Sequence, residues 1–162
     1  MIVGGCGNLS VIFRGKGIRM ARLRSTVDAK GRVVIPAKLR QRYVGPLWIT
    51  ASLEEGYLSC YNEEHFVSVR DELLSYSGTD TDLRRFRLRF VGEALEVNPD
   101  AQGRITVSSE LWSLIGVSPG DEIYVTDMHR TLEFCQAKRF DDELNETMRV
   151  SNIDVSKYEI DL

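Results

Sequence analysis

VDAKGRVVIPAKLR, residues 27–40, and PDAQGRITVSSELW, residues 99–112, are two copies of one pattern in a chain of 162 residues. Each copy contains Asp, Ala, a polar residue, Gly and Arg, followed by alternating apolar residues and a helix-like segment. Asp28 aligns with Asp100, and Gly31-Arg32 aligns with Gly103-Arg104. Because glycine adopts a positive φ at little cost, each copy predicts a tight turn between two short strands. The repeated turn is therefore the main guide to both fold and function.

Working outward from the turns, both copies predict the same order of elements: strand, turn, strand, short helix, hairpin and longer helix. Residues 22–27 alternate as a strand does, and Pro36 suits the first turn of a short helix over residues 36–43. LWIT (47–50) begins a hairpin and matches IYVT (123–126) in the second copy. Two copies are too few for a solenoid array, so a closed pair sharing one core is expected.

Capping residues and apolar spacing predict the longer helices. Asn62 caps a helix whose apolar stripe is Phe66, Val69 and Leu73. In the second copy Ser108 or Ser109 caps a short helix that ends at Gly116, and a last helix near residues 138–148 is acidic on its exposed face. The tail from about residue 151 has no clear period.

A connecting helix, capped by Asp80 or Thr81, carries apolar residues at helical spacing and four arginines between them. The apolar residues are Leu83, Phe86 and Phe90, and the arginines are Arg84, Arg85, Arg87 and Arg89. Two interpretations are open. The arginines contact DNA, or the helix is a partly buried connector whose arginines pair with acidic neighbours.

The charge is distributed unevenly along the chain. The net charge is −3, yet the segment from Arg14 to Arg42 holds ten basic residues and one acidic residue, a net of +9. Residues 43–162 therefore carry −12, since residues 1–13 have no charged side chain. This asymmetry predicts one cationic face on an acidic body and an anionic polymer as the partner to test, although a solvated run of charge is the alternative.

Several classes of protein are disfavoured. The chain has no run of about 18 apolar residues that could span a membrane. Its three cysteines, Cys6, Cys60 and Cys135, have no CxxC spacing, which fits a reducing cytoplasm without a disulfide framework or zinc site. Residues 1–19 make a poor signal peptide, and we interpret them either as a disordered leader or as residues upstream of a true start at Met20.

Catalytic chemistry is not indicated either, and no catalytic, metal-binding or cofactor-binding residue is predicted. His65 and His129 lack metal-ligand spacing, and the glycine-rich segments GGCGN and RGKG lack the spacing of a phosphate-binding loop. Asp28 and Asp100 could form a carboxylate pair. Each is followed four residues later by Arg, however, so an Asp–Arg brace across the turn is the simpler interpretation.

Such a brace would fix the shape of the loop and leave Lys30 and the remaining guanidinium donors facing outward. Arginine suits phosphate groups and the O6 and N7 acceptors of guanine. A merely stable hairpin would explain one copy. Two copies that both contain Arg, with the cationic segment around the first, favour a surface that binds nucleic acid.

These residues resemble a known family. VDAKGRVVIPAKLR is similar to the loop and strand of AbrB-like (SpoVT-AbrB, swapped-hairpin) DNA-binding domains, and LIGVSPGDEIYV (114–125) resembles the segment after their helix. Two such domains joined by the connector RRFRLRF (84–90) resemble the MraZ family of bacterial transcriptional regulators, from about Met20 to Met148. The resemblance implies an α+β, mostly β fold, in which two tandem swapped-hairpin units form a small intertwined (double-split) β-barrel with helices packed outside.

The resemblance also implies a function, which we state as an expectation. Ring-shaped homo-oligomers would bind double-stranded DNA at short direct repeats in their own promoter, within the division and cell-wall gene cluster, in the cytoplasm and nucleoid. No membrane partner, small-molecule substrate or cofactor is implied. An AbrB-like antitoxin and a ring scaffold that does not bind DNA are the alternatives.

The expected boundaries are 1–19 for the leader, 20–77 and 93–148 for the two AbrB-like domains, 78–92 for the connector and 149–162 for the tail. Carried over by motif and by the basic strand, the expected DNA-binding residues are Arg22, Arg24, Asp28, Lys30, Gly31, Arg32, Asp100, Gly103 and Arg104. The second turn has Gln102 in place of Lys30 and Ser108 in place of Pro36, so we expect the first turn to dominate phosphate binding.

Overall fold

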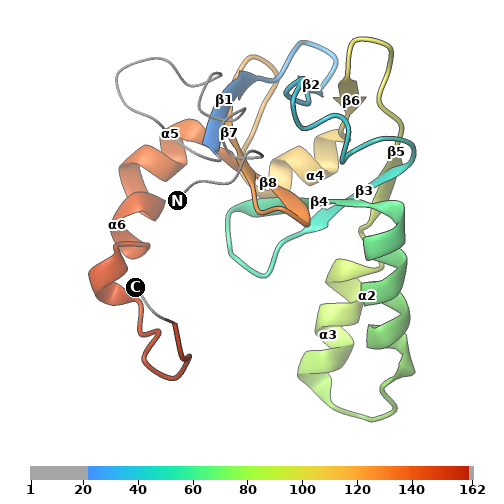
Figure 1. Ribbon diagram of the computed structural model, residues 1–162, viewed down its shortest axis with the longest axis vertical. Coiled ribbons are helices and arrows are strands. Elements are labelled where there is room, and N and C mark those ends of the chain that lie inside the picture. The colour runs from blue at the N-terminus through green and yellow to red at the C-terminus, as the bar shows by residue number, and fades with distance from the viewer. Residues whose placement is uncertain (1–21, 161–162) are drawn as a thin grey trace.

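Two antiparallel sheets form the centre of the protein, whose computed structural model describes residues 22–160 (Figure 1). The leader expected over residues 1–19 lies outside the described residues. The larger sheet has the strand order β1-β7-β8-β4-β3-β5, and the smaller one pairs β2 with β6. The strands are β1 (Arg22–Thr26), β2 (Arg32–Val34), β3 (Leu47–Ala51), β4 (Tyr57–Asn62), β5 (Leu95–Val97), β6 (Arg104–Thr106), β7 (Glu122–Asp127) and β8 (Thr131–Gln136).

Helices lie at both ends of the larger sheet, and α4 lies against one of its faces. Among the described residues they are α2 (Glu63–Ser75), α3 (Thr81–Phe90), α4 (Ser109–Leu114), α5 (Ala137–Arg139), the π-helix η1 (Phe140–Leu144), α6 (Asn145–Thr147) and the 3₁₀ helix η2 (Val150–Asn152). In Figure 1, α2 and α3 extend as a pair from one side of the sheet, and α5 and α6 extend from the other. The helix expected near residues 138–148 is thus present as three consecutive helical segments, one of them with π-type hydrogen bonds.

The two repeats share one core. Strands of the second repeat, β7 and β8, lie between β1 and β4 of the first, and β5 adds to β3. The core-facing residues of both repeats make a single buried cluster, which includes Val27, Ile49, Ile105, Val125 and Phe134. Side chains alternate between the two faces of a sheet along each strand, and these residues lie between the larger sheet and the elements that cover it. The covering elements are the ribbon of β2 and β6 and helix α4. The expected sharing of one core is confirmed.

The fold is α+β and mostly sheet, as the sequence predicts. The larger sheet is open, however, because β1 and β5 lie at its edges and neither pairs with a second strand of residues 22–160. Strand pairing within the described residues therefore gives two open antiparallel sheets and not a closed barrel.

The short helix predicted over residues 36–43 is wrong, because this segment forms a series of hydrogen-bonded turns. The backbone N–H of Leu39 donates to the carbonyl of Pro36 at 2.8 Å, an i to i+3 bond. In the second repeat Ser108 occupies the position of Pro36, and its hydroxyl accepts from the N–H of Leu111 and caps α4. Proline has no side-chain acceptor for this bond, so the first repeat lacks the N-cap that starts the helix in the second.

Helices α2 and α3 begin where the sequence predicts. Asn62 caps α2 through the N–H of His65, and Asp80, not Thr81, caps α3 through the N–H of Leu83. Of the expected stripe on α2 only Phe66 is fully buried, because the pair of helices extends beyond the sheet. Three of the four connector arginines bind other residues of the described chain. Arg85 pairs with Asp82, and Arg89 pairs with Glu93. Arg87 donates hydrogen bonds to the carbonyls of Leu73 and Tyr76.

Candidate nucleic-acid interface

The first turn, residues 28–32, is held by one carboxylate. Asp28 Oδ1 accepts hydrogen bonds from the backbone N–H groups of Lys30 and Arg32, each at 2.9 Å. Its other oxygen, Oδ2, accepts from the Nε of Arg32 at 2.6 Å. Gly31 has φ +75°, and its N–H closes the turn on the carbonyl of Asp28 at 3.0 Å. Since Arg32 is held through Nε, its two Nη groups make no hydrogen bond to the rest of residues 22–160.

The second turn, residues 100–104, repeats this geometry. Asp100 Oδ1 accepts from the N–H groups of Gln102 and Arg104 at 2.9 Å each, and Oδ2 accepts from Arg104 Nε at 2.7 Å. Gly103 again has φ +75°. The one difference is the side chain of Gln102, whose Oε1 accepts from an Nη group of Arg104 at 3.4 Å. The predicted Asp–Arg brace is therefore present in both copies.

The ribbon of β2 and β6 brings the two arginine turns together. Its register pairs Arg32 with Thr106 and Val34 with Arg104, with Val33 opposite Ile105 between them. Val33 and Ile105 are buried, so the alternation places both arginines on the outward face, at diagonal corners. Between them lies Val34, whose side chain is 42% exposed. Two braced guanidinium groups thus share one exposed ribbon face.

Each repeat also stabilises the turn of the other. The N–H of Ile35 donates to the carbonyl of Gly103 at 2.8 Å, and the N–H of Val107 donates to the carbonyl of Gly31 at 3.2 Å. The two bonds join aligned positions of the repeats, so exchanging the first repeat for the second converts one bond into the other. The two turns are therefore related by an approximate two-fold symmetry. The first turn gains a further bond from the indole Nε1 of Trp112 to the same carbonyl, at 3.0 Å.

Sequence reasoning missed the residues that cover the turn glycines. Trp112 lies against Gly31, and Arg40 lies against Gly103 while its Nε donates to the carbonyl of Ile35 at 2.9 Å. The two side chains occupy the same position of the repeat, because Arg40 follows Leu39 as Trp112 follows Leu111. Aligning the two repeats shows that Arg40 and Trp112 are equivalent, but it does not show that each contacts the turn glycine of the other repeat.

Electrostatics keep both bracing carboxylates ionised. The backbone N–H of Arg32 is the largest cause that lowers the pKa of Asp28, followed by the Arg32 guanidinium and the N–H of Lys30, against an opposing effect of burial. The pKa of Asp100 is lowered in the same way by Arg104 and Gln102. A carboxylate that accepts several N–H bonds is stabilised in its charged form. Both braces are therefore intact at neutral pH.

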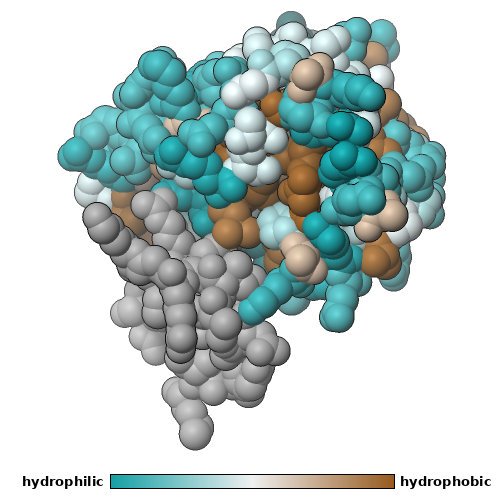
Figure 2. All heavy atoms as spheres, turned by 90° about the horizontal axis from the view of Figure 1, so that it is seen from above, coloured by the Kyte–Doolittle hydropathy of each residue, from teal (hydrophilic) through white to brown (hydrophobic). Residues whose placement is uncertain are grey.

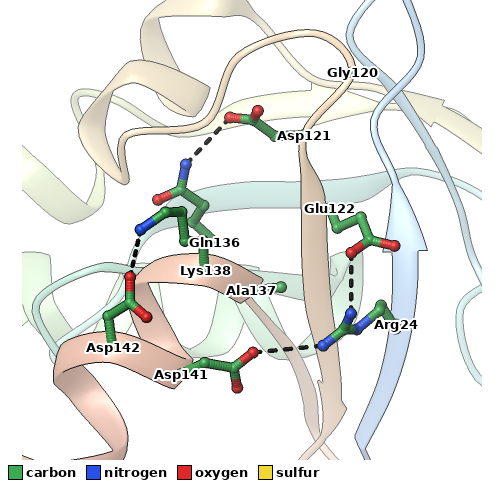
Figure 3. Close-up of a pocket in the computed structure, with 9 residues that line it drawn as sticks. All are labelled: Arg24, Gly120, Asp121, Glu122, Gln136, Ala137, Lys138, Asp141 and Asp142. Carbon is green, nitrogen blue, oxygen red and sulfur yellow. Dashed lines mark hydrogen bonds and ion pairs between the residues drawn. The ribbon is translucent and has the colours of Figure 1, made fainter.

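The other two predicted residues, Arg22 and Arg24, are not brought to the ribbon. Arg24 pairs with Glu122 at 3.0 Å and with Asp141 at 3.4 Å (Figure 3). It also donates to the hydroxyl of Tyr124 at 2.7 Å. The Arg22 guanidinium lies over the rings of Tyr124 and Phe140, 4.6 and 4.4 Å from their centres. The acidic helical segment after β8 thus neutralises part of the cationic face that the sequence predicts.

The remaining basic residues of the first repeat differ in their availability. Arg42 pairs with Asp127 and donates to the carbonyl of His129 at 3.2 Å. Lys30 is exposed at the tip of the first turn, where its side chain can reach a phosphate group. Figure 2 views the end at which β2 and β6 lie and shows hydrophilic side chains bordering a central apolar strip. This end combines the two braced arginines with an apolar centre.

Two other kinds of site are absent from residues 22–160. No group of three or more His, Cys, Asp or Glu side chains there could hold a metal ion. No helix within the same range has the length and apolar character needed to cross a membrane. Cys60 and Cys135 are buried free thiols, and burial raises the pKa of both.

Comparison with known proteins identifies the relatives of this chain. It is 30% identical over 132 residues to the transcriptional regulator MraZ of Ligilactobacillus salivarius, covering 76% of this chain and 92% of that protein. It is 33% identical over 108 residues to MraZ of Acetivibrio thermocellus, with 67% and 73% covered. It is 30% identical over 131 residues to MraZ of Lactobacillus delbrueckii subsp. bulgaricus, with 79% and 90% covered.

Two further comparisons add little. No family model matches the chain. The solution structure of PHS018 from Pyrococcus horikoshii is similar at 16% identity over 72% of this chain and 87% of that one, with a TM-score of 0.29, which is too low to support an argument.

The names of these relatives give the class of the protein, which is a transcriptional regulator. Within that class, the identity and coverage assign the family. The chain belongs to the MraZ family.

Proposed function

We propose that this protein binds DNA sequence-specifically through the outward face of the ribbon and thereby regulates transcription. The observation that carries the proposal is the pair of Asp-braced arginines, Arg32 and Arg104, on one exposed face. The major groove of B-DNA admits a two-stranded ribbon, and an arginine such as Arg32, whose two Nη groups make no hydrogen bond within residues 22–160, can bond guanine O6 and N7. In Arg104 one Nη group also donates to Gln102. The relatives named MraZ are transcriptional regulators, which supports the same function.

Each residue of the proposed interface has a separate role. Arg32 and Arg104 read base edges, Asp28 and Asp100 orient them, and Gly31 and Gly103 allow the turns. Lys30 contacts phosphate, which makes the first turn the stronger phosphate binder because Gln102 replaces it in the second. Arg22 and Arg24 support the acidic helical segment and do not contact DNA directly, in keeping with their ion pairs and ring contacts.

We further propose, from the resemblance to AbrB-like domains, that residues 20–77 and 93–148 are two swapped-hairpin units joined by the connector 78–92, with 149–162 as a tail. The reciprocal bonds from Ile35 to Gly103 and from Val107 to Gly31 support this arrangement. Assembly into a ring would let several weak ribbons bind direct repeats by effective concentration, in the promoter of the division and cell-wall cluster at the nucleoid. Exposed Leu74 and Leu88 on the projecting helices, together with exposed Tyr76 directly after α2, support a contact between subunits.

Fluorescence anisotropy tests the proposal. The protein is titrated into a duplex of its own upstream promoter region and into a scrambled duplex, at two salt concentrations. We expect tighter binding to the promoter that persists at the higher salt, and a loss of this preference in Arg32→Ala and Arg104→Ala. Arg149→Ala is the matched control, because Arg149 is exposed and, within residues 22–160, its side chain pairs only with Glu146.

Two results would redirect the proposal. Equal and steeply salt-dependent binding to both duplexes would mean that the protein contacts phosphates only. No binding to either duplex, together with a large mass by light scattering, would favour the ring scaffold that does not bind DNA. A loss of the circular dichroism spectrum in Arg32→Ala would show that the arginine serves mainly as a structural brace.

A further inference from the structure

A second feature lies on the opposite face of the larger sheet, away from the ribbon. There a cavity of about 540 Å³ opens between the outer face of the sheet and the helical segment η1–α6. In Figure 1 this face is the one flanked by α5 and α6 on one side and by α2 and α3 on the other. Pockets for small molecules typically have volumes of roughly 300 to 1,000 Å³, so the cavity has the right size for one small ligand.

A polar row crosses the sheet at the floor of this cavity. The strand register places Arg22 opposite Thr126, Thr126 opposite Glu133, and Glu133 opposite Ser59. Directly opposed residues of antiparallel strands point to the same face, so the four side chains form one line. Arg22, Thr126 and Glu133 all line the cavity, and Ser59 is buried beneath it. A guanidinium and a carboxylate thus stand two strands apart with a hydroxyl between them.

The carboxylate of Glu133 is oriented but not neutralised. Its Oε2 accepts from the hydroxyl of Ser59 at 2.7 Å and its Oε1 from the hydroxyl of Thr131 at 2.8 Å. Within residues 22–160 no cationic side chain pairs with it. Burial raises the pKa of Glu133, although the hydroxyls of Ser59, Thr131 and Ser52 oppose the shift. A carboxylate has about four acceptor sites, so both oxygens can still accept a bond from a ligand.

The cation at the other end of the row also lacks a counter-charge. Arg22 lies over the rings of Tyr124 and Phe140, and in the described part of the chain it makes no ion pair or hydrogen bond. The hydroxyl of Thr126, between the two charges, is likewise without a side-chain partner there. Stacking fixes the plane of the guanidinium but leaves its N–H donors available to an anion.

The walls around this polar floor are largely apolar, apart from Ser52 and the exposed Glu54, which also line the cavity. The apolar walls are formed by Leu53, Tyr57, Met128, Phe140 and Met148. Leu53 at the tip of the β3–β4 hairpin is 86% exposed and Met128 is 60% exposed, so the rim presents apolar surface that could cover a bound molecule. The cavity therefore offers the carboxylate of Glu133 and the guanidinium of Arg22 on its floor and largely apolar walls, with the exposed carboxylate of Glu54 as a second negative group.

We propose that this cavity binds a small zwitterion with an apolar side chain, of the α-amino-acid class, with its ammonium on Glu133 and its carboxylate on Arg22. The spacing is suitable: neighbouring strands lie about 4.8 Å apart, so the Cα atoms of Arg22 and Glu133 are separated by roughly 10 Å. A gap of this width has room for the two charged groups of one amino acid. Thr126 donates to the ligand carboxylate at the centre of the row.

A ligand with only one charge would leave half of this row unpaired. An amine would neutralise Glu133 but give Arg22 no anion, and a carboxylic acid would do the reverse. Charge-assisted hydrogen bonds are the strong ones, and a buried charge without a partner is costly. The site should therefore prefer a zwitterion over either of its singly charged fragments.

Isothermal titration calorimetry on the full chain tests this preference with matched ligands. L-leucine is compared with 3-methylbutylamine, which lacks the carboxylate, and with 4-methylpentanoate, which lacks the ammonium; L-phenylalanine, phenethylamine and 3-phenylpropanoate form a second series. We expect at least one amino acid to bind about tenfold more tightly than both of its fragments. No binding of either amino acid at about 10 mM, or equal binding of an amino acid and its amine, would overturn the proposal.

Two variants assign the contacts. Glu133→Gln keeps the shape and should weaken binding of the amino acid about tenfold while leaving binding of the corresponding acid unchanged. Thr126→Val should weaken the amino acid and the acid alike. Glu64→Gln, on the exposed first turn of α2, is the control. Unchanged affinity in Glu133→Gln, with a native circular dichroism spectrum, would exclude the assigned site.

Discussion

The indole Nε1 of Trp112 donates a hydrogen bond to the carbonyl of Gly31 at 3.0 Å, so a side chain of the second repeat closes the turn of the first. The same carbonyl accepts from the N–H of Val107. A Cβ on Gly31 would lie 2.9 Å from the Val107 carbonyl oxygen, which is backbone and cannot move aside easily. The first arginine turn therefore depends on close packing between the repeats as well as on its own glycine.

Gly31→Ala should consequently lower the free energy of unfolding by more than the cost of placing an alanine at a positive φ. Gly116→Ala is the control, because Gly116 has φ +71° and no atom of residues 22–160 lies within 4 Å of an added Cβ. A left-handed conformation costs an alanine about 1–2 kcal/mol. We expect Gly116→Ala to lower the free energy of unfolding by this amount and Gly31→Ala by at least about 1 kcal/mol more. Urea unfolding measures both, and equal losses would show that the contact with Val107 is relieved cheaply.

The brace can be weakened without removing the arginine. Asp28→Asn retains the acceptor for the backbone N–H groups of Lys30 and Arg32, but it replaces the charged oxygen that holds Arg32 Nε. We expect a folded protein whose affinity for the promoter duplex falls about tenfold, since the side-chain NH₂ of Asn is a donor that cannot accept from Arg32 Nε, and the charge-assisted bond is lost. Asp82→Asn, in the exposed pair with Arg85, is the control for anisotropy. Wild-type affinity in Asp28→Asn would mean that Arg32 needs no brace.

Variants of Lys30 and Arg24 distinguish a side chain that contacts phosphate from one whose charge is already paired within the protein. Lys30→Ala should weaken binding to promoter and scrambled duplexes alike and reduce the slope of log K against log salt by about 1. Arg24→Ala should leave that slope unchanged, because Glu122 and Asp141 already pair with Arg24. The measurement is a salt titration of both variants by anisotropy. An equal fall in slope for Arg24→Ala would restore the basic strand to the interface.

The sequence predicted the local features well because their causes are local. The Asp–Arg turns, the caps at Asn62 and Asp80 and the hairpins depend on residues within a few positions of one another. The helix expected at 36–43 failed for a local reason too, since Pro36 removes the cap that Ser108 supplies. The repeat alignment shows that Pro36 stands where the second copy has Ser108, but proline also suits the first turn of a helix, so the loss of the cap was not predicted.

Long-range features could not be predicted in the same way. That β7 and β8 lie between β1 and β4 depends on how the repeats interlock, which strand periodicity does not encode. The same pairing carries Arg22 and Arg24 to the acidic segment after β8 and away from the ribbon. The cavity had one sequence signal: Glu133 lies between Leu132 and Phe134 in a strand whose other face is buried.

Glu133 makes a further prediction about stability. Burial raises its pKa in the folded protein, so the folded state binds this proton more tightly than the unfolded state does. Stability should therefore fall as the pH rises from the unfolded value of about 4.3 through the raised folded pKa. Glu133→Gln removes this effect and should raise the free energy of unfolding at pH 7 by on the order of 1 kcal/mol, or roughly 2–4 °C in Tm. Thermal melts at pH 5 and pH 7 measure it, and a lower Tm for the variant at pH 7 would contradict the prediction.

Asp28 and Asp100 should show the opposite dependence on pH. Their pKa values are lowered in the folded protein, so their contribution to stability is present above the ordinary value of 3.8 and is lost as the pH falls through the lowered pKa. Carboxyl resonances in ¹³C NMR should titrate below 3.8 for both.

Arg32→Ala provides the internal test, because Asp100 in the same sample is the control. The backbone N–H of residue 32 is the largest cause of the shift and is retained in this variant. The Asp28 midpoint should therefore rise only part of the way to its ordinary value, while the Asp100 midpoint stays where it was. A complete return of Asp28 would show that the guanidinium alone holds the turn, and the loop would then have to be treated as unformed without its arginine.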